Sequence, residues 1–384
     1  MVDGKVVDGT ADGWHPDGYR PRLVRGHEPL WRSRGCVQLG LDPRWAIAVD
    51  GLSPALAELV RRLDGTRGAA ELVADAVAAG ARAGDAAALL ADLAAAGVIE
   101  DAELADPLPD ELAADVQAWR VRTGGAARAL VDRRRAATVR VHGDGRVGVA
   151  VAVLLAAAGV GHVISTAGGR VTRGDVGIGY LGDEVDRPRR AAAARAVERH
   201  RTPVAPGTAV ARPARTAVPD QPRVAEMGTV GTVGTVAAVV DVVDVAVVAD
   251  AAVHDTMLAT RLVGERVPHL AVQVVDGRAV VGPLVFPGRT GCLRCADLHR
   301  SERDPCWPRL AAQLAGRPST ASHAGTAVAA GLAAEQVLGL LAGSGEPATI
   351  GAGLDLDPLT GVVLREPRPA HPECGCGAAP KRSR

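Results

Sequence analysis

Four cysteines in the C-terminal part of the sequence are spaced in two close pairs. Cys292 and Cys295 form a CxxC motif, and Cys374 and Cys376 form a CxC motif, with glycine and proline around both pairs that let the backbone turn. Two close pairs of thiolates, brought together by folding, are the usual ligand set of a closed tetrahedral zinc site. Such a site stabilises a fold by cross-linking distant segments of the chain. We therefore predict a structural zinc ion bound by these four residues.

Two alternatives use the same motifs. A CxxC motif can be a redox-active dithiol, but that motif opens a helix after a strand of the thioredoxin type, which we do not expect here. His371 could replace one thiolate as a metal ligand. The remaining cysteines, Cys36 and Cys306, have no close cysteine neighbour. We expect both to be packed and unreactive.

The cysteine pairs must be positioned by a fold whose first half has the pattern of a nucleotide-binding unit. Residues 138–142 alternate like a strand, 149–158 form a strongly apolar helix, and 162–165 form a second strand. Between the first strand and the helix lies a G-x-G-x-x-G turn made by Gly143, Gly145 and Gly148. A βαβ unit with this turn can hold a phosphate at the helix N-terminus.

Two features of that unit disfavour a bound dinucleotide. Asp144 lies in the glycine turn, where its carboxylate would repel a phosphate. The second strand runs into a Ser-Thr-Ala-Gly-Gly stretch that lacks the acidic residue needed to hold a ribose. We therefore predict a Rossmann-like fold without NAD.

Downstream, the apolar pattern continues. The valine-rich segment 239–249 reads as a buried strand that ends at Asp250, followed by a helix at 255–264 and a strand at 269–275. This alternation predicts a parallel sheet with crossover helices. The Gly-Thr-Val repeat at 228–236 is of low complexity and is expected to be a loop.

The N-terminal part reads as a separate small domain. Residues 36–41 and 45–49, on either side of Asp-Pro-Arg, predict a β-hairpin. Three helices follow, capped by Ser53, Thr66 and Asp85, and then a short strand at 98–99. The order is typical of a winged-helix-like domain, for which DNA binding is the simplest hypothesis. The third helix carries no Arg, Lys, Asn or Gln to contact base edges, which disfavours that function.

Instead, this domain resembles the PqqD-like leader-recognition elements of peptide-modifying enzymes. The hydrophobic hairpin, the Leu-Asp-Gly-Thr before the second helix, and the Leu-x-x-x-Gly-Val-Ile at the end of the third carry the resemblance. It implies that the leader of a precursor peptide pairs with the hairpin edge while apolar side chains enter a groove beside a helix. We place the groove between the hairpin and the third helix, although each residue could equally be plain core. The candidate contacts are Val37, Leu39, Ile47, Val49, Leu89 and Leu93.

Residues 137–377 resemble the ThiF, or ubiquitin-activating-type, superfamily. The resemblance rests on the Rossmann-like half, the strand ending at Asp250, and the stretch 283–295 that leads into the first cysteine pair. Within that superfamily, CADLHR at 295–300 and DPCWP at 304–308 are similar to the partner proteins of thiazole/oxazole-forming (TOMM) cyclodehydratases.

Departures from the superfamily pattern bear on catalysis. Active members resemble one another in a G-x-G-G-x-G loop, an acidic residue after the second strand, an Asn-Leu-x-Arg-Gln stretch and a downstream Lys. Here DVGIGYL stands in place of the Arg-bearing stretch, and Arg187 and Arg189 occupy the region of the Lys. Only Asp250 or Asp255 could supply a metal-binding carboxylate. Adenylation requires Mg-ATP held by fixed positive charge and a metal-binding carboxylate. The resemblance therefore implies a degenerate nucleotide site, and we assign no catalytic residue.

Together, the resemblances imply a non-catalytic protein of ribosomal-peptide (bacteriocin) biosynthesis. It would bind a precursor leader and present the core to a separate YcaO-type cyclodehydratase, in which azolines form. The alternative is an ATP-dependent ThiF-like adenylyltransferase acting on a peptide or carrier-protein C-terminus, with Arg187, Arg189 and Asp250 at its site.

Composition limits the other partners. The 384 residues include 44 basic and 44 acidic ones, so no net charge attracts nucleic acid or an anionic membrane. The N-terminus has no apolar signal region, and no stretch approaches the roughly 20 charge-free apolar residues of a membrane span. We therefore expect a cytoplasmic protein. The leucine-rich segment 327–341 is either core or the interface of a homodimer.

These observations predict an α/β protein with a small winged-helix-like domain in front of a larger Rossmann-like one. The expected division is a flexible N-terminus at 1–29, a leader-recognition domain at 30–101, a linker at 102–136, a ThiF-like domain with the zinc site at 137–377, and a flexible tail at 378–384.

Overall fold

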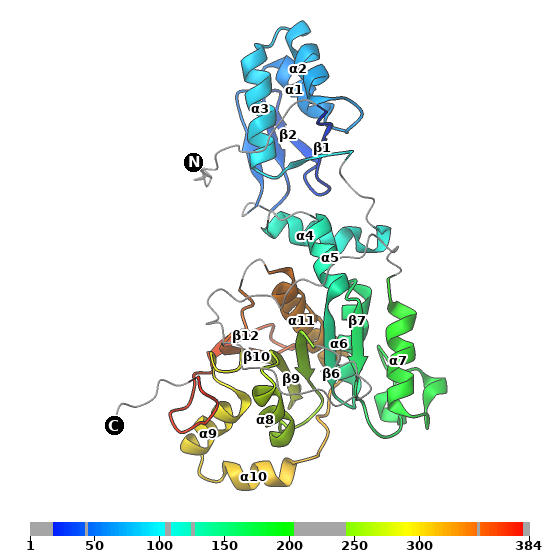
Figure 1. Cartoon of the computed structure of the whole chain (residues 1–384), viewed down its shortest axis with the longest axis vertical. Coiled ribbons are helices and arrows are strands. Elements are labelled where there is room, and N and C mark those ends of the chain that lie inside the picture. The colour runs from blue at the N-terminus through cyan, green and yellow to red at the C-terminus, as the bar shows by residue number, and fades with distance from the viewer. Residues whose placement is uncertain are drawn as a thin grey trace, which may run out of the picture. The chain divides into compact units, whose positions relative to one another are not determined.

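The computed structural model describes residues 18–42, 45–103, 109–123, 127–202, 243–343 and 346–378. It divides into two compact units, Met1–Val131 and Asp132–Arg384 (Figure 1). The predicted loop repeat at 228–236 and the predicted tail from residue 379 onward lie outside the described residues.

Unit 1 contains two small antiparallel sheets. One has the order β2-β3-β4, formed by β2 (Pro29–Ser33), β3 (Cys36–Leu39) and β4 (Ile47–Val49). Pairing of β3 with β4 confirms the predicted hairpin, whereas β2 was not predicted. The other sheet pairs β1 (Pro21–Leu23) with β5 (Ile99–Asp101). Because β1 falls within the stretch predicted to be flexible, the ordered unit begins before residue 30.

Three helices cover one face of the larger sheet. α1 (Pro54–Arg61) begins as predicted, with the Ser53 hydroxyl accepting a hydrogen bond from the Leu56 N–H. The caps predicted for the other two helices are wrong: Gly68 precedes α2 (Ala69–Ala78), and Arg82 precedes α3 (Ala83–Ala95). Thr66 lies two residues before the observed cap Gly68, and its hydroxyl donates to Asp64 at 2.6 Å.

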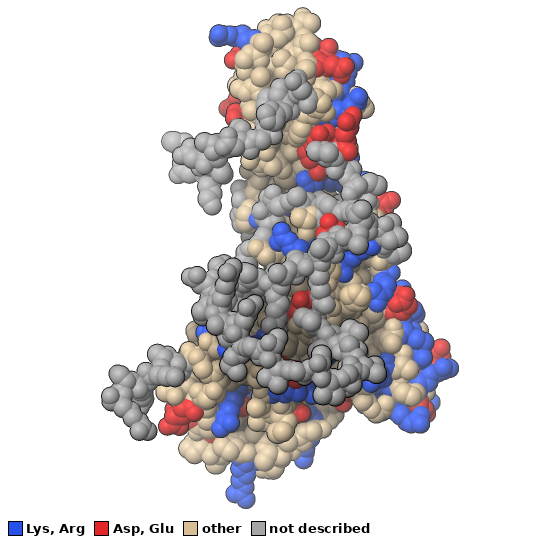
Figure 2. Space-filling model, in the orientation of Figure 1, with Lys and Arg blue, Asp and Glu red and all other residues tan. Residues whose placement is uncertain are grey.

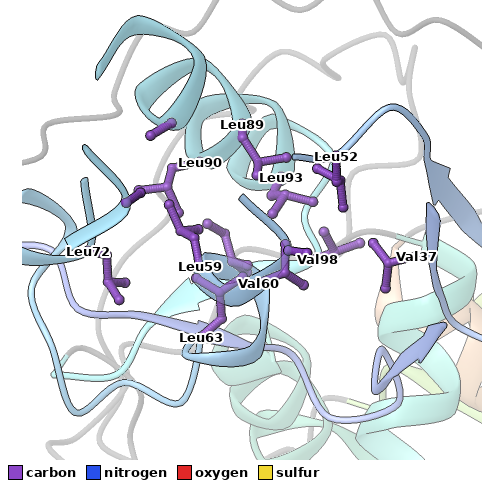
Figure 3. Close-up of a cluster of buried hydrophobic side chains, with 14 of the residues drawn as sticks. Val37, Leu52, Leu59, Val60, Leu63, Leu72, Leu89, Leu90, Leu93 and Val98 are labelled. Atoms are coloured by element: carbon purple, nitrogen blue, oxygen red, sulfur yellow. The ribbon is translucent and has the colours of Figure 1, made fainter. Parts of the chain in front are cut away.

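The core of unit 1 lies between these helices and the sheet (Figure 3). Leu59, Val60, Leu72, Leu90 and Leu93 from the helices are almost fully buried there. The chain continues through α4 (Ala113–Thr123) and α5 (Ala127–Ala136). An ion pair of 2.8 Å between Arg120 of α4 and Glu100 of β5 ties α4 to the unit.

Unit 2 is built on one mixed sheet of seven strands in the order β12-β11-β10-β9-β8-β6-β7. The strands are β6 (Thr138–His142), β7 (His162–Ser165), β8 (Val245–Val248), β9 (His269–Val275), β10 (Arg278–Val285), β11 (Ala352–Leu356) and β12 (Val363–Pro367). The four strands β7, β6, β8 and β9 are parallel, as predicted. The other three run antiparallel to their neighbours, which was not predicted. Asp276 and Gly277, both at positive φ, form the tight turn that reverses the chain between β9 and β10.

The helices described in unit 2 are α6 (Arg146–Ala157), α7 (Arg189–His200), α8 (Thr256–Gly264), α9 (Leu293–Arg303), α10 (Trp307–Leu314) and α11 (His323–Ala342). The helices α6, α7 and α11 contact strands of the sheet, and α10 contacts α9. α11 lies against α6, β9 and β10. It is long and apolar enough to cross a membrane by length and composition, contrary to the sequence expectation, but 56% of its apolar window is buried inside the structure. Its burial is that of a core helix, and a homodimer interface at this helix stays a prediction.

Basic and acidic side chains of the described residues are interspersed over the face shown in Figure 2. This distribution accords with the zero net charge of the sequence.

Candidate functional site

The two cysteine pairs come from segments of unit 2 that are far apart in the sequence. Cys292 is the N-cap residue of α9, and Cys295 lies in the first turn of that helix. Cys374 and Cys376 lie in the segment that follows β12. The CxxC motif therefore does open a helix, so the sequence argument used against a redox dithiol was wrong on this point.

All four sulfur atoms converge. The Sγ atoms of Cys292 and Cys295 are 3.7 Å apart, and those of Cys292 and Cys374, and of Cys295 and Cys376, are each 3.6 Å apart. All four lie within 4.8 Å of one another. A tetrahedral zinc ion with Zn–S bonds of ~2.3 Å requires sulfur atoms ~3.8 Å apart. The cluster therefore has the size and donor set of a four-thiolate site and can bind a metal such as zinc.

Burial and hydrogen bonds shift the pKa values of three of these thiols in different directions. The Cys292 thiol and the backbone N–H groups of His371 and Cys292 point at the Cys295 sulfur and lower the pKa of Cys295. Burial raises the pKa of Cys374, and the hydrogen bond to Cys295 raises the pKa of Cys292. A divalent cation that binds the cluster would displace thiol protons.

His371 does not take the place of a thiolate. Its ring lies against His299, with centroids 4.6 Å apart, and its Nε2 is 2.9 Å from Oε1 of Glu302. Only its backbone reaches the cluster. Cys306 also differs from the prediction, because it is exposed at the start of α10 rather than packed.

The glycine turn after β6 encloses an aspartate of the chain itself. Asp250 follows β8, and its Oδ1 accepts a hydrogen bond of 2.9 Å from the Val147 N–H while its Oδ2 accepts one of 2.8 Å from the Gly148 N–H. These N–H groups belong to the first turn of α6, which starts at Arg146 rather than at residue 149 as predicted. The free donors of a helix N-terminus are the groups that bind a phosphate in such loops, and here a carboxylate occupies them.

The three glycines are required by this carboxylate. A Cβ atom at Gly143 or Gly148 would lie 2.6 Å from Oδ2 of Asp250, and one at Gly145 would lie 2.9 Å from Oδ1. Burial raises the pKa of Asp250, and hydrogen bonds from Gly148, Val147 and Gly145 oppose that rise. The predicted G-x-G-x-x-G loop is therefore present, closed around Asp250.

Other groups predicted for a nucleotide site are also engaged within the chain. Asp144 accepts a hydrogen bond of 2.6 Å from the Gly168 N–H, which ties the loops after β6 and β7 together. Arg189 forms an ion pair of 2.7 Å with Asp175, and both side chains are largely buried. Asp255 caps α8 by accepting the Met257 N–H at 2.8 Å.

The predicted peptide-binding side chains lie mostly in the core of unit 1. Val37, Leu39, Leu89 and Leu93 are 0%, 0%, 8% and 2% exposed and belong to one cluster (Figure 3). Ile47 and Val49 are partly buried against the same cluster. The first four side chains are therefore core residues, which is the alternative left open by the sequence, and peptide binding at these residues stays a prediction.

Sequence reasoning missed the apolar side chains that do reach the surface of unit 1. Leu41 is 80% exposed and Trp45 is 42% exposed, one on each side of the β3–β4 turn, and Leu30 on β2 is also exposed. An available signal was the Trp45 side chain beside a turn, where burial is difficult. Sequence reasoning also gave no role to the CADLHR and DPCWP motifs, which fall on α9 and at the start of α10.

Comparisons with known proteins agree with this architecture. The model of the ThiF family matches residues 122–378. The structure of Escherichia coli MccB with ATP is similar at a TM-score of 0.64 and 17% identity, covering 93% of this chain and 99% of MccB. Escherichia coli MccB with AMPCPP and MccA gives a TM-score of 0.65 at 16% identity, covering 94% and 99%.

A third similar structure is that of the heterocyclase TruD, with a TM-score of 0.57 and 14% identity, covering 94% of this chain and 43% of TruD. At these identities the likenesses establish the fold alone. No protein with a curated description matches the chain.

Proposed function

The chain belongs to the ThiF family, and from this premise we propose that it is a non-catalytic scaffold that binds the leader of a ribosomally synthesised precursor peptide. In this proposal the bound precursor is presented to a separate YcaO-type cyclodehydratase for azoline formation. Tethering raises the local concentration of the core peptide at the partner's active site to roughly the millimolar range.

The observation that carries the proposal is the position of Asp250. Its carboxylate accepts hydrogen bonds from the Val147 and Gly148 N–H groups, which an adenylating enzyme of this fold would leave for phosphate oxygens. A triphosphate entering the loop would meet the Asp250 side chain, which is 7% exposed and already holds these donors. Arg189, one of the basic residues predicted for a nucleotide site, is already paired with Asp175.

Unit 1 supports leader binding through its open sheet edges. Within the described residues, β2 and β4 each pair with β3 alone, so each leaves an outer row of N–H and C=O groups. An extended peptide can add to such an edge, with main-chain hydrogen bonds giving affinity. We favour the β4 edge, because Trp45 and Leu41 provide exposed apolar contacts beside it. This position keeps the proposed PqqD-like element but moves its contacts from the core leucines to the rim of the hairpin.

The proposal also assigns zinc to the four-cysteine cluster. The ion would fix the start of α9 to the segment after β12, and its four sulfur ligands would leave no open position for catalysis.

The role beside a cyclodehydratase draws on the likeness to the heterocyclase TruD, of which the matched region spans 43%. MccB has been solved with MccA, which favours a peptide as the ligand of this architecture.

The test is a pair of calorimetric titrations of the full chain, one with Mg-ATP and one with synthetic leader peptides from small precursor genes encoded nearby. We expect micromolar or tighter leader binding and no saturable ATP binding. Trp45→Ala should weaken leader binding about tenfold or more, as for an aromatic contact at an interface. Val77→Ala is the matched control, because Val77 on α2 is 43% exposed against 42% for Trp45. Equal effects of the two variants would overturn the assignment of the leader site.

A second candidate is an ATP-dependent adenylyltransferase acting on a peptide or carrier-protein C-terminus. It is favoured by the coverage of 99% of MccB, which has been solved with ATP. Pyrophosphate release that depends on the peptide would establish this activity and refute the scaffold.

A further inference from the structure

A small cavity lies in unit 2, and neither the four cysteines nor the three glycines of the loop line it. It measures about 50 Å³ and opens between the residues after β8, one face of β9 and β10, and the helices α9 and α10. The two helices are drawn in yellow in Figure 1. Its wall includes three arginines, Arg300, Arg303 and Arg368, with Asp297 and Trp307. Neither the proposed leader binding nor the zinc site uses these five residues.

The charges around the cavity do not cancel. Arg368 is paired with Glu366 at 2.8 Å. Among the described residues, Arg300 and Arg303 form no ion pair, and Asp297 is the acidic residue in the wall. Burial lowers the pKa of His254, also in the wall, to about 4, so this imidazole is neutral at pH 7. Basic side chains therefore outnumber acidic ones in the wall of the cavity.

Arg300 is held in position for binding. Its guanidinium lies over the indole ring of Trp307, 4.3 Å from the centroid. The Trp307 Nε1–H in turn donates to Oδ1 of Asp297 at 3.4 Å. A guanidinium stacked on an aromatic face keeps its in-plane N–H groups free, and these match the two oxygens of a carboxylate.

The structure assigns to this cavity a binding site for one carboxylate, of the kind found at a peptide C-terminus or on an Asp or Glu side chain. Arg300 would bind the carboxylate in its guanidinium plane, and Arg303 would add a second positive charge. A planar carboxylate fits two in-plane N–H groups of one guanidinium, and Asp297 would repel a phosphate dianion about twice as strongly as a carboxylate monoanion. The volume of about 50 Å³ admits a carboxylate but not a nucleotide. This site goes beyond the proposed function and does not depend on it.

The test uses small probes on the full chain. N-acetylglycine represents a peptide C-terminus, and the α-amide of N-acetylglutamate represents an acidic side chain, with N-acetylglycinamide as the uncharged control. Binding is followed by tryptophan fluorescence at millimolar concentrations, and Trp307→Phe identifies the part of the signal that comes from the cavity. We expect saturation with one or both carboxylates and none with the amide control; the stronger carboxylate identifies the source.

Arg300→Gln should weaken that binding at least tenfold, because hydrogen bonds to a charged partner are lost. Arg294→Gln is the matched control, since Arg294 is an exposed arginine of α9 outside the cavity wall. Equal titrations for Arg300→Gln and Arg294→Gln, or no saturation in the unaltered protein, would overturn the site. Tighter binding of inorganic phosphate than of either carboxylate would overturn the choice of ligand. A protein that binds the probes but no leader peptide would retain this site and lose the proposed function.

Discussion

Replacing Cys374 by serine should remove the metal and destabilise unit 2. The Sγ atoms of Cys292 and Cys374 are 3.6 Å apart, although the residues are 82 positions apart in the chain. Closing a loop of that length restricts the unfolded chain by about 4.5 kcal/mol in the chain-entropy model, with 82 as the loop length. A metal bound to the folded form alone adds its own binding free energy. For a unit of this size, a loss of that order lowers the Tm by about 10 °C or more.

Two measurements check this prediction. Elemental analysis of the protein purified in the presence of zinc should give one zinc per chain, and less than half of that for Cys374→Ser. Thermal unfolding should show the expected fall in Tm for the transition of unit 2, and a strong chelator should reproduce it in the unaltered protein. Cys306→Ser is the matched control, because Cys306 is exposed and outside the cluster. Unaltered protein that carries no zinc after purification in its presence, or a Tm for Cys374→Ser equal to that of the unaltered protein, would refute the inference that these thiols form a metal site.

Two further predictions concern the glycine loop and acid stability. Gly148→Ala should lower the free energy of unfolding by about 1–3 kcal/mol in denaturant titrations, because the new Cβ would lie 2.6 Å from Asp250 Oδ2. Gly264→Ala is the control and should be neutral or stabilising, because there is open space around Gly264. Equal effects of the two variants would contradict the packing of the loop. Burial lowers the pKa of His142 and His254 from the ordinary 6.5 to about 4. Between pH 6.5 and pH 4 these histidines therefore take up protons only in the unfolded chain. The free energy of unfolding should fall as the pH falls through this range. His142→Gln should reduce that loss in denaturant titrations at several pH values, and an unchanged pH profile would contradict the assignment.

Local sequence patterns predicted the local elements well. Ser53 before Pro54 is the N-cap of α1, and the strand-turn-helix-strand order at 138–165 is the observed βαβ unit. These signals work because capping and apolar periodicity act between residues that are close in the sequence. Wrong assignments at Thr66 and Asp85 have the same origin. Several residues near a helix start can serve as its cap, and neighbouring hydrogen bonds decide which one does.

The direction of the later strands required a turn signal that was overlooked. Asp276-Gly277 between two valine-rich segments is a hairpin signal, since both residues accept positive φ. Counting apolar runs alone suggests a continuing parallel sheet and misses this reversal. The sequence therefore contains the signal for the reversed strand, but it lies in the turn residues and not in the spacing of the apolar residues.

The sequence by itself determined which chemistries the chain can carry: four paired thiols for a metal, a glycine loop at a helix start, and no charge excess for nucleic acid. Only the tertiary structure decided what those groups face. It brought residues 82 positions apart to 3.6 Å, placed the Asp250 carboxylate in the glycine loop, and buried Leu89 and Leu93 in a core. The reason is physical. Residue type and spacing determine local conformation and donor atoms, whereas burial and contacts between distant segments depend on the packing of the whole unit.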